Sequence, residues 1–189
     1  MKLIGFTGAG GTGKSTIASN FNNIIKSPVD DIRKIVYGQD SKYGDIKDIE
    51  EFVSFQRLIL ETQMHMWLAK YNKFKDTDEV IISERSPIDY AAYMAHMEDK
   101  GYNEVINYYI DDCISYTDRN YNAIVYFPMS SFIAKNDVNS SKERNIESAK
   151  KTDDYIQGFL DCVEVPVLTL KSTKIEDRIE EIKNFIYSI

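Results

Sequence analysis

The sequence predicts an α/β fold in which a five-stranded parallel sheet is covered by helices on both faces. Short apolar segments alternate with longer amphipathic ones, which is typical of strands buried between two helical layers. The first apolar segment leads directly into a glycine-rich loop, GAGGTGKS, at residues 8–15. The chain has 189 residues without an internal repeat or a Pro/Gly/Ser-rich linker, so we expect one domain over residues 1–189.

The first part of the chain is expected to contain two strands and two helices. They are a strand at Lys2–Phe6, a helix from about Lys14 to Ile25, a strand near Ile25–Val29 and a short helix at 32–37. Asp30 and Asp31 interrupt the apolar pattern, so we expect them at the end of the second strand. A polar, glycine-containing stretch follows at 38–44.

A long amphipathic helix is predicted over about 48–74. Its apolar side is expected to carry Phe52, Phe55, Ile59, Met66 and Leu68. The turn at 76–79 precedes a third strand at Val80–Ile82, and Pro87 suits the first turn of a helix at 88–98. A further helix is expected at about 102–116.

The last part of the chain supplies two more strands and two more helices. A strand at 122–127 ends at Pro128, and the polar segment 134–144 then leads into a helix that reaches Cys162. We expect residues 130–162 to form a helical lid. A fifth strand at 166–170 and a closing amphipathic helix at 175–187 complete the pattern. Right-handed crossovers between parallel strands then give a three-layer domain.

The charge balance favours small-molecule chemistry over nucleic-acid binding. The net charge is −7 and the pI is about 4.9, whereas extensive binding to the phosphates of DNA or RNA needs a basic surface. The N-terminal apolar run is short and enters the glycine loop, so we interpret it as a strand and not as a signal peptide. No segment approaches the roughly 20 apolar residues of a membrane span. We expect a soluble, cytoplasmic protein.

The loop at 8–15 matches the phosphate-binding pattern G-x-x-x-x-G-K-[ST] and has a strand before it and a helix after it. Glycines allow successive backbone N–H groups to point at phosphate oxygens, and the helix N-terminus adds partial positive charge. Lys14 is expected to reach the β- and γ-phosphates of ATP, and the Ser15 hydroxyl to bind Mg²⁺. The expected nucleotide-binding residues are Gly8, Ala9, Gly10, Gly11, Thr12, Gly13, Lys14, Ser15 and Thr16.

Other classes of P-loop protein lack support in the sequence. A GTPase should carry a D-x-x-G switch and an N-K-x-D guanine-binding motif, and neither occurs. A transport ATPase should carry a signature such as L-S-G-G-Q, which is also absent. A motor or remodelling ATPase usually needs a larger chain. Small kinases remain, because they need only a core, an acceptor pocket and a lid.

The third strand ends in Ser83-Glu84-Arg85-Ser86, beside the expected phosphate loop. A carboxylate at this strand tip can hold Mg²⁺ directly or through water, which makes Glu84 a metal-ligand candidate beside Ser15. Arg85 can clamp an acceptor or stabilise charge on the transferred phosphoryl group. The alternative is a surface ion pair that caps the strand.

Glu84-Arg85-Ser86 resembles the D/E-R-S motif of deoxynucleoside and nucleotide kinases. Phe52-Val-Ser-Phe55-Gln56 resembles that family's aromatic-Gln element, which implies that Gln56 reads a nucleobase edge. Ser27-Pro28-Val29 is similar to the family's Glu-Pro-Val element, but Ser27 stands where the family has its catalytic glutamate. The base role would then pass to Asp30 or Asp31.

The chain also resembles the ribosylnicotinamide-kinase-like P-loop ATPases, which include small phage kinases. The shared features are the motif after the third strand, an arginine-bearing lid, the strand Val165–Leu170 and the pair Asp177-Arg178. Arg144 is the best candidate for the lid arginine, the alternative being a solvated, flexible loop.

Each of the residues expected to contact the acceptor has two possible roles. Asp30 or Asp31 is a catalytic base or a helix cap. Arg33 contacts a substrate phosphate or is a solvated helix residue, and Gln56 binds a base or lies on the outer face of its helix. A hydroxyl acceptor needs a base, whereas a monophosphate acceptor needs cations.

Together these features predict an ATP- and Mg²⁺-dependent kinase acting on a deoxynucleoside or a (deoxy)nucleoside monophosphate. One alternative is a polynucleotide or modified-base DNA kinase, which the low pI disfavours. Another is a nucleotide-dependent regulatory switch that transfers no phosphate to a small molecule. The helix at 48–74 can supply a homodimer face.

Overall fold

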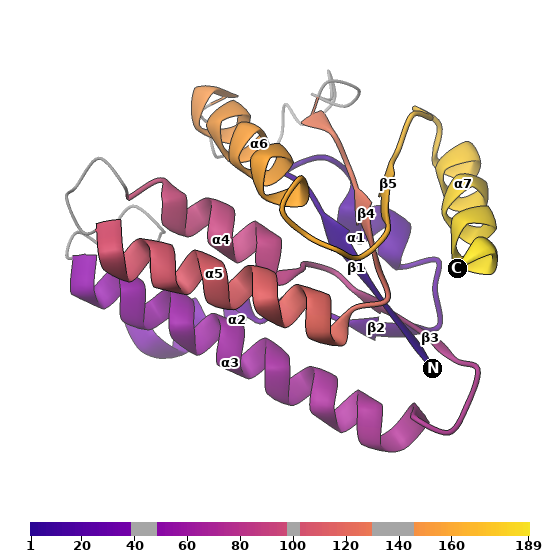
Figure 1. The fold of residues 1–189 in the computed structure, drawn as a ribbon, viewed down its shortest axis with the longest axis horizontal. Coiled ribbons are helices and arrows are strands. Elements are labelled where there is room, and N and C mark those ends of the chain that lie inside the picture. Colours follow the sequence, from indigo (N-terminus) through magenta and orange to yellow (C-terminus); the bar gives the residue numbers. More distant parts are fainter. Residues whose placement is uncertain (39–48, 98–102, 130–145) are drawn as a thin grey trace.

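Five parallel strands form the centre of the fold, in the order β2-β3-β1-β4-β5 (Figure 1). The computed structural model describes residues 1–38, 49–97, 103–129 and 146–189. The strands are β1 Lys2–Thr7, β2 Asn23–Ile25, β3 Val80–Ser83, β4 Ala123–Tyr126 and β5 Val167–Thr169. The predicted five-stranded parallel sheet is therefore confirmed.

Strand β1 lies in the middle of the sheet, between β3 and β4. Its register pairs Gly5 with Ser83 of β3 and Thr7 with Tyr126 of β4. Because the strands are parallel, their carboxyl ends meet at one edge, and the loop after β1 lies at the centre of that edge. Open α/β sheets bind ligands at such an edge.

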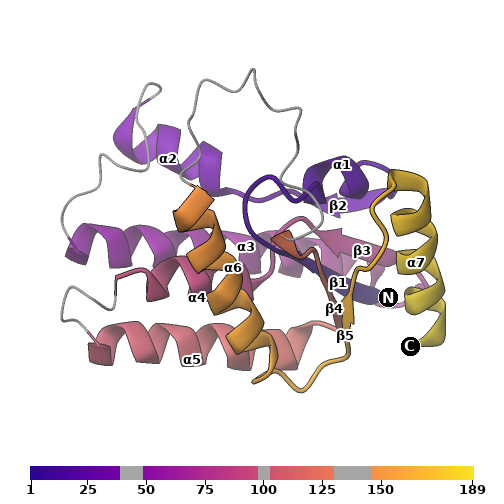
Figure 2. The same ribbon diagram turned by 90° about the horizontal axis from the view of Figure 1, so that it is seen from above.

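Helices cover both faces of the sheet, as predicted. They are α1 Lys14–Ala18, α2 Val29–Tyr37, α3 Ile49–Phe74, α4 Pro87–Ala95, α5 Asn103–Asn120, α6 Ile146–Leu160 and α7 Ile175–Ser188. Helices α1 and α7 lie on one face, and α3 to α6 lie on the other (Figure 2). On the first face, Ile17 and Ile182 pack against Phe6. On the second, Ile88 and Ile156 pack against Ile124.

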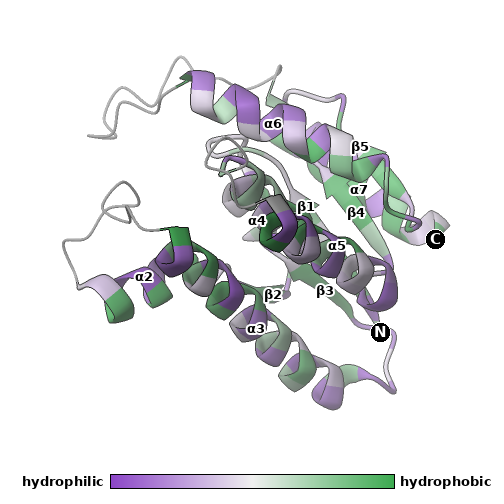
Figure 3. Ribbon diagram, turned by 60° about the vertical axis from the view of Figure 1, so that its left-hand side comes forward, coloured by the Kyte–Doolittle hydropathy of each residue, from purple (hydrophilic) through white to green (hydrophobic). Residues whose placement is uncertain are grey.

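A further apolar cluster joins helices α2 to α5. Phe55 and Ile59 of α3 pack there with Tyr90 of α4 and Tyr109 of α5, all nearly inaccessible to solvent. Strand β4 is hydrophobic along its length, whereas the outer helix α6 has a mixed surface (Figure 3). The cluster holds α3 and α4 together, and these helices carry residues of the candidate site.

The region after the glycine loop differs from the prediction. The helix expected at 14–25 ends at Ala18, and the second strand lies at Asn23–Ile25 and not at 25–29. The side chains of Ser19 and Asn20 donate to the carbonyl O of Thr16 at 2.8 and 2.9 Å. These bonds compete with continued helix, because short polar side chains satisfy the carbonyls at the helix end.

This shift also moves the next helix. Pro28 is the N-cap of α2, which begins at Val29 and not at residue 32. Asp30 and Asp31, which were predicted to end a strand, therefore lie in the first turn of α2. The other elements match within a few residues, including α3, which was expected at 48–74. Leu68 was expected on the apolar side of that helix, but it is 46% exposed.

The segment predicted as the polar part of the lid, 134–144, lies outside the described residues, as does Arg144. Helix α6, which we expected to follow it, is present. Within the described ranges, the helices lack the combination of length and apolarity needed to cross a membrane.

Candidate active site

The phosphate-binding loop occupies the turn between β1 and α1. Gly13 is the N-cap of α1 with φ of 91°, a left-handed conformation that favours glycine. A Cβ on Gly8 would lie 2.5 Å from the carbonyl O of Phe127, so a side chain there would collide with the end of β4. The local backbone geometry therefore explains why Gly8 and Gly13 are glycines, and the loop fits closely against the sheet edge.

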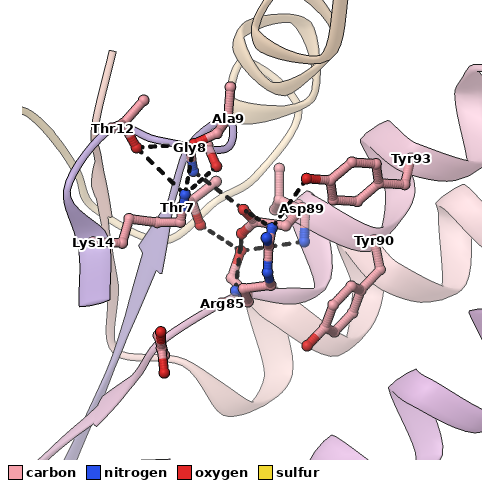
Figure 4. Close-up of polar contacts among 12 residues, drawn as sticks. Thr7, Gly8, Ala9, Thr12, Lys14, Arg85, Asp89, Tyr90 and Tyr93 are labelled. Carbon is pink, nitrogen blue, oxygen red and sulfur yellow. Dashed lines mark hydrogen bonds and ion pairs between the residues drawn. The ribbon is translucent and has the colours of Figure 1, made fainter. Parts of the chain in front are cut away.

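Lys14 is buried and folds back over its own loop. Its Nζ donates to the carbonyl oxygens of Gly8 and Ala9, the latter at 2.8 Å, and lies 3.3 Å from Thr12 Oγ1 (Figure 4). Burial, together with the nearby charge of Arg85, lowers the pKa of Lys14 from 10.5 to about 7. Phosphate oxygens favour the ammonium form, so a bound polyphosphate would reverse this shift.

The two predicted Mg²⁺ ligands lie together. Ser15 Oγ, at the start of α1, donates to Oε1 of Glu84, which follows β3. The backbone N–H of Glu84 donates to the carbonyl O of Ile25 at 2.8 Å, which ties the loop after β3 to β2. A hydroxyl and a carboxylate beside a phosphate loop fit Mg²⁺, since this ion takes few protein ligands and completes its shell with phosphates and water.

The Arg85 guanidinium is held beside the loop by helix α4. Its Nη1 lies 3.3 Å from Asp89 Oδ1 and 3.4 Å from Tyr93 Oη. The guanidinium carbon is 5.3 Å from the centre of the Tyr93 ring, within range of a cation–π contact. Its side chain is 20% exposed, so Arg85 is oriented yet reachable from the cleft.

Asp89 joins the phosphate loop to the loop after β3 (Figure 4). This fully buried carboxylate accepts from the backbone N–H of Gly8 at 3.2 Å and of Ser86 at 3.0 Å, besides pairing with Arg85. Ser86 is the N-cap of α4 and forms a capping box with Asp89. We did not predict this role, although the spacing S-x-x-D is a known helix-start signal.

Gln63 of α3 is a second residue that the sequence analysis missed. Its Nε2 donates to Ser83 Oγ and to the carbonyl O of Arg85, the latter at 2.9 Å, while its Oε1 accepts from Tyr90 at 2.6 Å. Gln63 therefore fixes the backbone that carries Glu84 and Arg85. No local sequence signal marks it, since its partners lie 20 or more residues away.

The phosphate loop, Glu84 and Arg85 border one cleft of about 630 Å³, whereas Asp89 and Gln63 support it from behind without lining it. The size suits a small-molecule site. Beyond the phosphate loop, the lining comes from the loop after β2, the first turn of α2, the loop after β3 and α4. The lining residues are Gly10, Gly11, Thr12, Gly13, Lys14, Ser15, Thr16, Lys26, Ser27, Val29, Asp30, Asp31, Glu84, Arg85 and Tyr93.

Asp30 and Asp31 line this cleft from the first turn of α2 and not from a strand end as predicted. Both side chains are exposed, and Asp30 lies 3.5 Å from Arg33, one turn further along the helix. Carboxylates in the first turn stabilise a helix. The first turn of α2 therefore leaves both carboxylates at the cleft, besides favouring the helix.

Arg33 and Gln56 are both buried, at 8% and 1% exposure. The alternatives of a solvated arginine and an outer-face glutamine are therefore wrong. Neither Arg33 nor Gln56 is among the cleft-lining residues in the described part of the chain. Gln56 Oε1 is buried without a hydrogen-bond partner among the described residues. Buried polar atoms are normally bonded.

The sheet order, the glycine loop and the residues around it define a P-loop nucleotide-binding domain. The chain belongs to a family whose profile is described as an AAA domain and matches residues 3–178. AAA domains are P-loop domains, in agreement with the loop at residues 8–15. None of the proteins with curated descriptions matches this sequence.

Solved structures with the same fold include three of deoxyadenosine kinase from M. mycoides. The structure with the products dCMP and a flexible dCDP has a TM-score of 0.68 and 20% identity, over 100% of both chains. The structure with dATP has a TM-score of 0.61 at 17% identity, and that with dCTP has 0.57 at 20%. Both alignments cover 99% of this chain and 100% of the other. This chain shares the fold of a P-loop deoxynucleoside kinase.

Proposed function

We propose that this protein is an ATP- and Mg²⁺-dependent kinase that phosphorylates a deoxynucleoside or a (deoxy)nucleoside monophosphate. One observation carries the proposal: the phosphate loop and the acceptor-side residues Asp30, Asp31 and Arg85 border a single cleft. Phosphoryl transfer needs donor and acceptor to be held in line in one water-poor space. The fold that this chain shares with the M. mycoides deoxyadenosine kinase supports the same proposal.

On the donor side, the loop's N–H groups and Lys14 would hold the phosphates of ATP. Ser15 and Glu84 would hold Mg²⁺, which neutralises charge on the β- and γ-phosphates when bound. Arg85 would stabilise the equatorial oxygens of the transferred group. Asp89 and Tyr93 would keep its guanidinium in place through the contacts described above.

On the acceptor side, Asp30 or Asp31 would accept the proton of an attacking hydroxyl. Both carboxylates border the cleft, and neither is buried in a structural role. A monophosphate acceptor already carries a nucleophilic oxygen, and it would instead use the cations Arg85 and Lys26 to offset repulsion. Both acceptor classes therefore belong to the proposal.

Recognition of the acceptor base is assigned to Gln56. The support for this role is its buried Oε1, which has no hydrogen-bond partner among the described residues and for which a ligand would supply the missing donor; Gln56 itself does not line the cleft. The M. mycoides enzyme is described with dATP, dCTP, dCMP and dCDP, so deoxynucleotides are the first compounds to test. We expect the reaction to take place in the cytoplasm. Arg144 and the lid at 130–162 stay predictions of the sequence.

The test is transfer of label from γ-labelled ATP, with Mg²⁺, to separate pools of nucleosides, nucleoside monophosphates, ribosylnicotinamide and DNA ends. Label on a deoxynucleoside or a monophosphate is the expected result. Label only on DNA would favour a polynucleotide kinase, and release of free phosphate alone would favour a regulatory ATPase; either result would contradict the proposal. Lys14→Ala should abolish transfer while circular dichroism shows an intact fold.

A further inference from the structure

A buried arginine from the last helix lies against the outer side of the phosphate loop. Arg178, near the start of α7, is 1% exposed. Its Nη1 donates to the carbonyl O of Thr12 at 3.0 Å, and its Nε donates to the carbonyl O of Ser172 at 2.8 Å. The guanidinium carbon lies 5.9 Å from the centre of the Phe127 ring. Arg178 thus touches the loops that follow β1 and β5, and the residue after β4.

A second residue of helix α7, Glu181, holds the loop after β5 in place. Glu181, one turn after Arg178, accepts from the backbone N–H of Lys171 at 3.1 Å and of Ser172 at 3.2 Å. Burial lowers the pKa of Arg178, and the Glu181 charge opposes that change. An arginine remains protonated even so. A fixed positive charge therefore lies against the Thr12 carbonyl.

The Thr12 carbonyl belongs to the same peptide group as the N–H of Gly13. In a trans peptide the C=O and N–H point in opposite directions. Because the Thr12 carbonyl points toward Arg178, the N–H of Gly13 points away from it. Gly13 lines the cleft. A charged donor on the carbonyl also polarises the peptide, which strengthens its N–H as a donor to an anion.

We propose that Arg178 is a positioning residue that orients and polarises the Thr12–Gly13 peptide for phosphate binding, and so sets the affinity for MgATP without touching the nucleotide. The proposal rests on the ATP binding proposed above, but not on the identity of the acceptor. It assigns a role in the donor site to a residue 166 positions away from its partner in the sequence.

The test measures binding of MgATP and of magnesium tripolyphosphate by calorimetry. Arg178→Met removes the charge and the donors, Arg178→Lys keeps the charge but loses the planar fork, and Arg119→Met is the matched control. Arg119 is exposed and donates only within its own helix, to Ser115, among the bonds described. We expect Arg178→Met to weaken both ligands by about tenfold, Arg178→Lys to recover part of the loss, and the control to change neither.

The outcomes separate this inference from the proposed function. If the wild-type protein binds no MgATP, the proposed function fails. If it binds and folded Arg178→Met has wild-type affinity, the role of Arg178 is overturned. Loss of ATP affinity alone, with tripolyphosphate unchanged, would also overturn it, because Arg178 would then act on the nucleoside through Ser172. Should Arg178→Met not fold, Arg178→Gln, which also removes the charge, is judged by the same criteria.

Discussion

At the scale of single residues, Lys14 combines a buried position with partners that are backbone carbonyls and a hydroxyl. Its pKa of about 7 follows from burial and from the charge of Arg85, while the carboxylates of Asp89, Glu84 and Asp153 oppose the shift. The lysine is therefore only partly charged near neutral pH. A polyphosphate would restore the ammonium form, so nucleotide binding should be coupled to protonation.

We predict that MgATP binding at pH 8 takes up close to one proton per site. Because Lys14 is largely neutral in the free protein above its pKa of about 7 and charged in the complex, affinity should fall as the pH rises above 7. Calorimetry in buffers with different ionisation enthalpies measures the uptake. At pH 6 the lysine is already protonated, and the uptake should approach zero. An uptake that is the same at both pH values would contradict the assignment to Lys14.

A second residue-scale prediction concerns Asp30 and Asp31. If the acceptor is a hydroxyl, either Asp30→Asn or Asp31→Asn should lower kcat by about 10²–10⁴, because the base can no longer accept a proton. The other variant serves as its control and should change kcat by less than about threefold. Steady-state rates with the best acceptor decide the matter. Losses below about tenfold in both variants would contradict a carboxylate base.

How far the sequence predicted the site depends on how local each signal is. The phosphate loop, Ser15 and Glu84 belong to short motifs next to strands, so their meeting at one sheet edge followed from parallel topology. Asp89 and Gln63, by contrast, bond to residues far away in the sequence. Asp89 bonds to Gly8, 81 positions away, and Gln63 bonds to Ser83, 20 positions away. Their roles come from tertiary contacts that one sequence does not display.

At the scale of elements, the strands and long helices were predictable because apolar runs and periodicity extend over many residues. The error lies between α1 and α2, where the elements are short: α1 has 5 residues and β2 has 3. There, the side chains of Ser19 and Asn20 decide where the helix ends. That local error moved Asp30 and Asp31 from a strand end to a helix start.

Helix α4 supplies the element-scale prediction. Ser86 is its N-cap, accepts from the backbone N–H of Ile88 at 3.2 Å, and contacts the buried hydroxyl of Thr7 on β1. Ser86→Ala should lower the free energy of unfolding by about 1–3 kcal/mol, because the cap is lost and Thr7 loses its partner. Chemical denaturation measures the change, with Ser115→Ala, at an exposed position of α5, as control at about 0.5 kcal/mol or less. Equal effects in the two variants would contradict the role of the cap.

At the scale of the whole molecule, the homodimer expected through α3 stays a prediction. Leu58, Leu68 and Tyr71 on this helix are between 38% and 46% exposed, so their side chains are available to a partner surface. We expect sedimentation to show a dimer that Leu68→Glu dissociates, whereas Ile35→Glu, an exposed position on α2, should leave it intact. A monomeric wild-type protein at all concentrations would contradict the prediction.

The single domain expected over residues 1–189 makes a prediction about cooperativity. All the strands share one sheet, and the phosphate loop lies at its centre, so heat should unfold the molecule in one transition. MgATP at 100 times its Kd should stabilise the fold by about 2.7 kcal/mol and raise Tm by roughly 5–11 °C. Differential scanning calorimetry measures both quantities, and Lys14→Ala should abolish the shift. Two separate transitions, only one of which responds to MgATP, would show that the chain is not one cooperative unit.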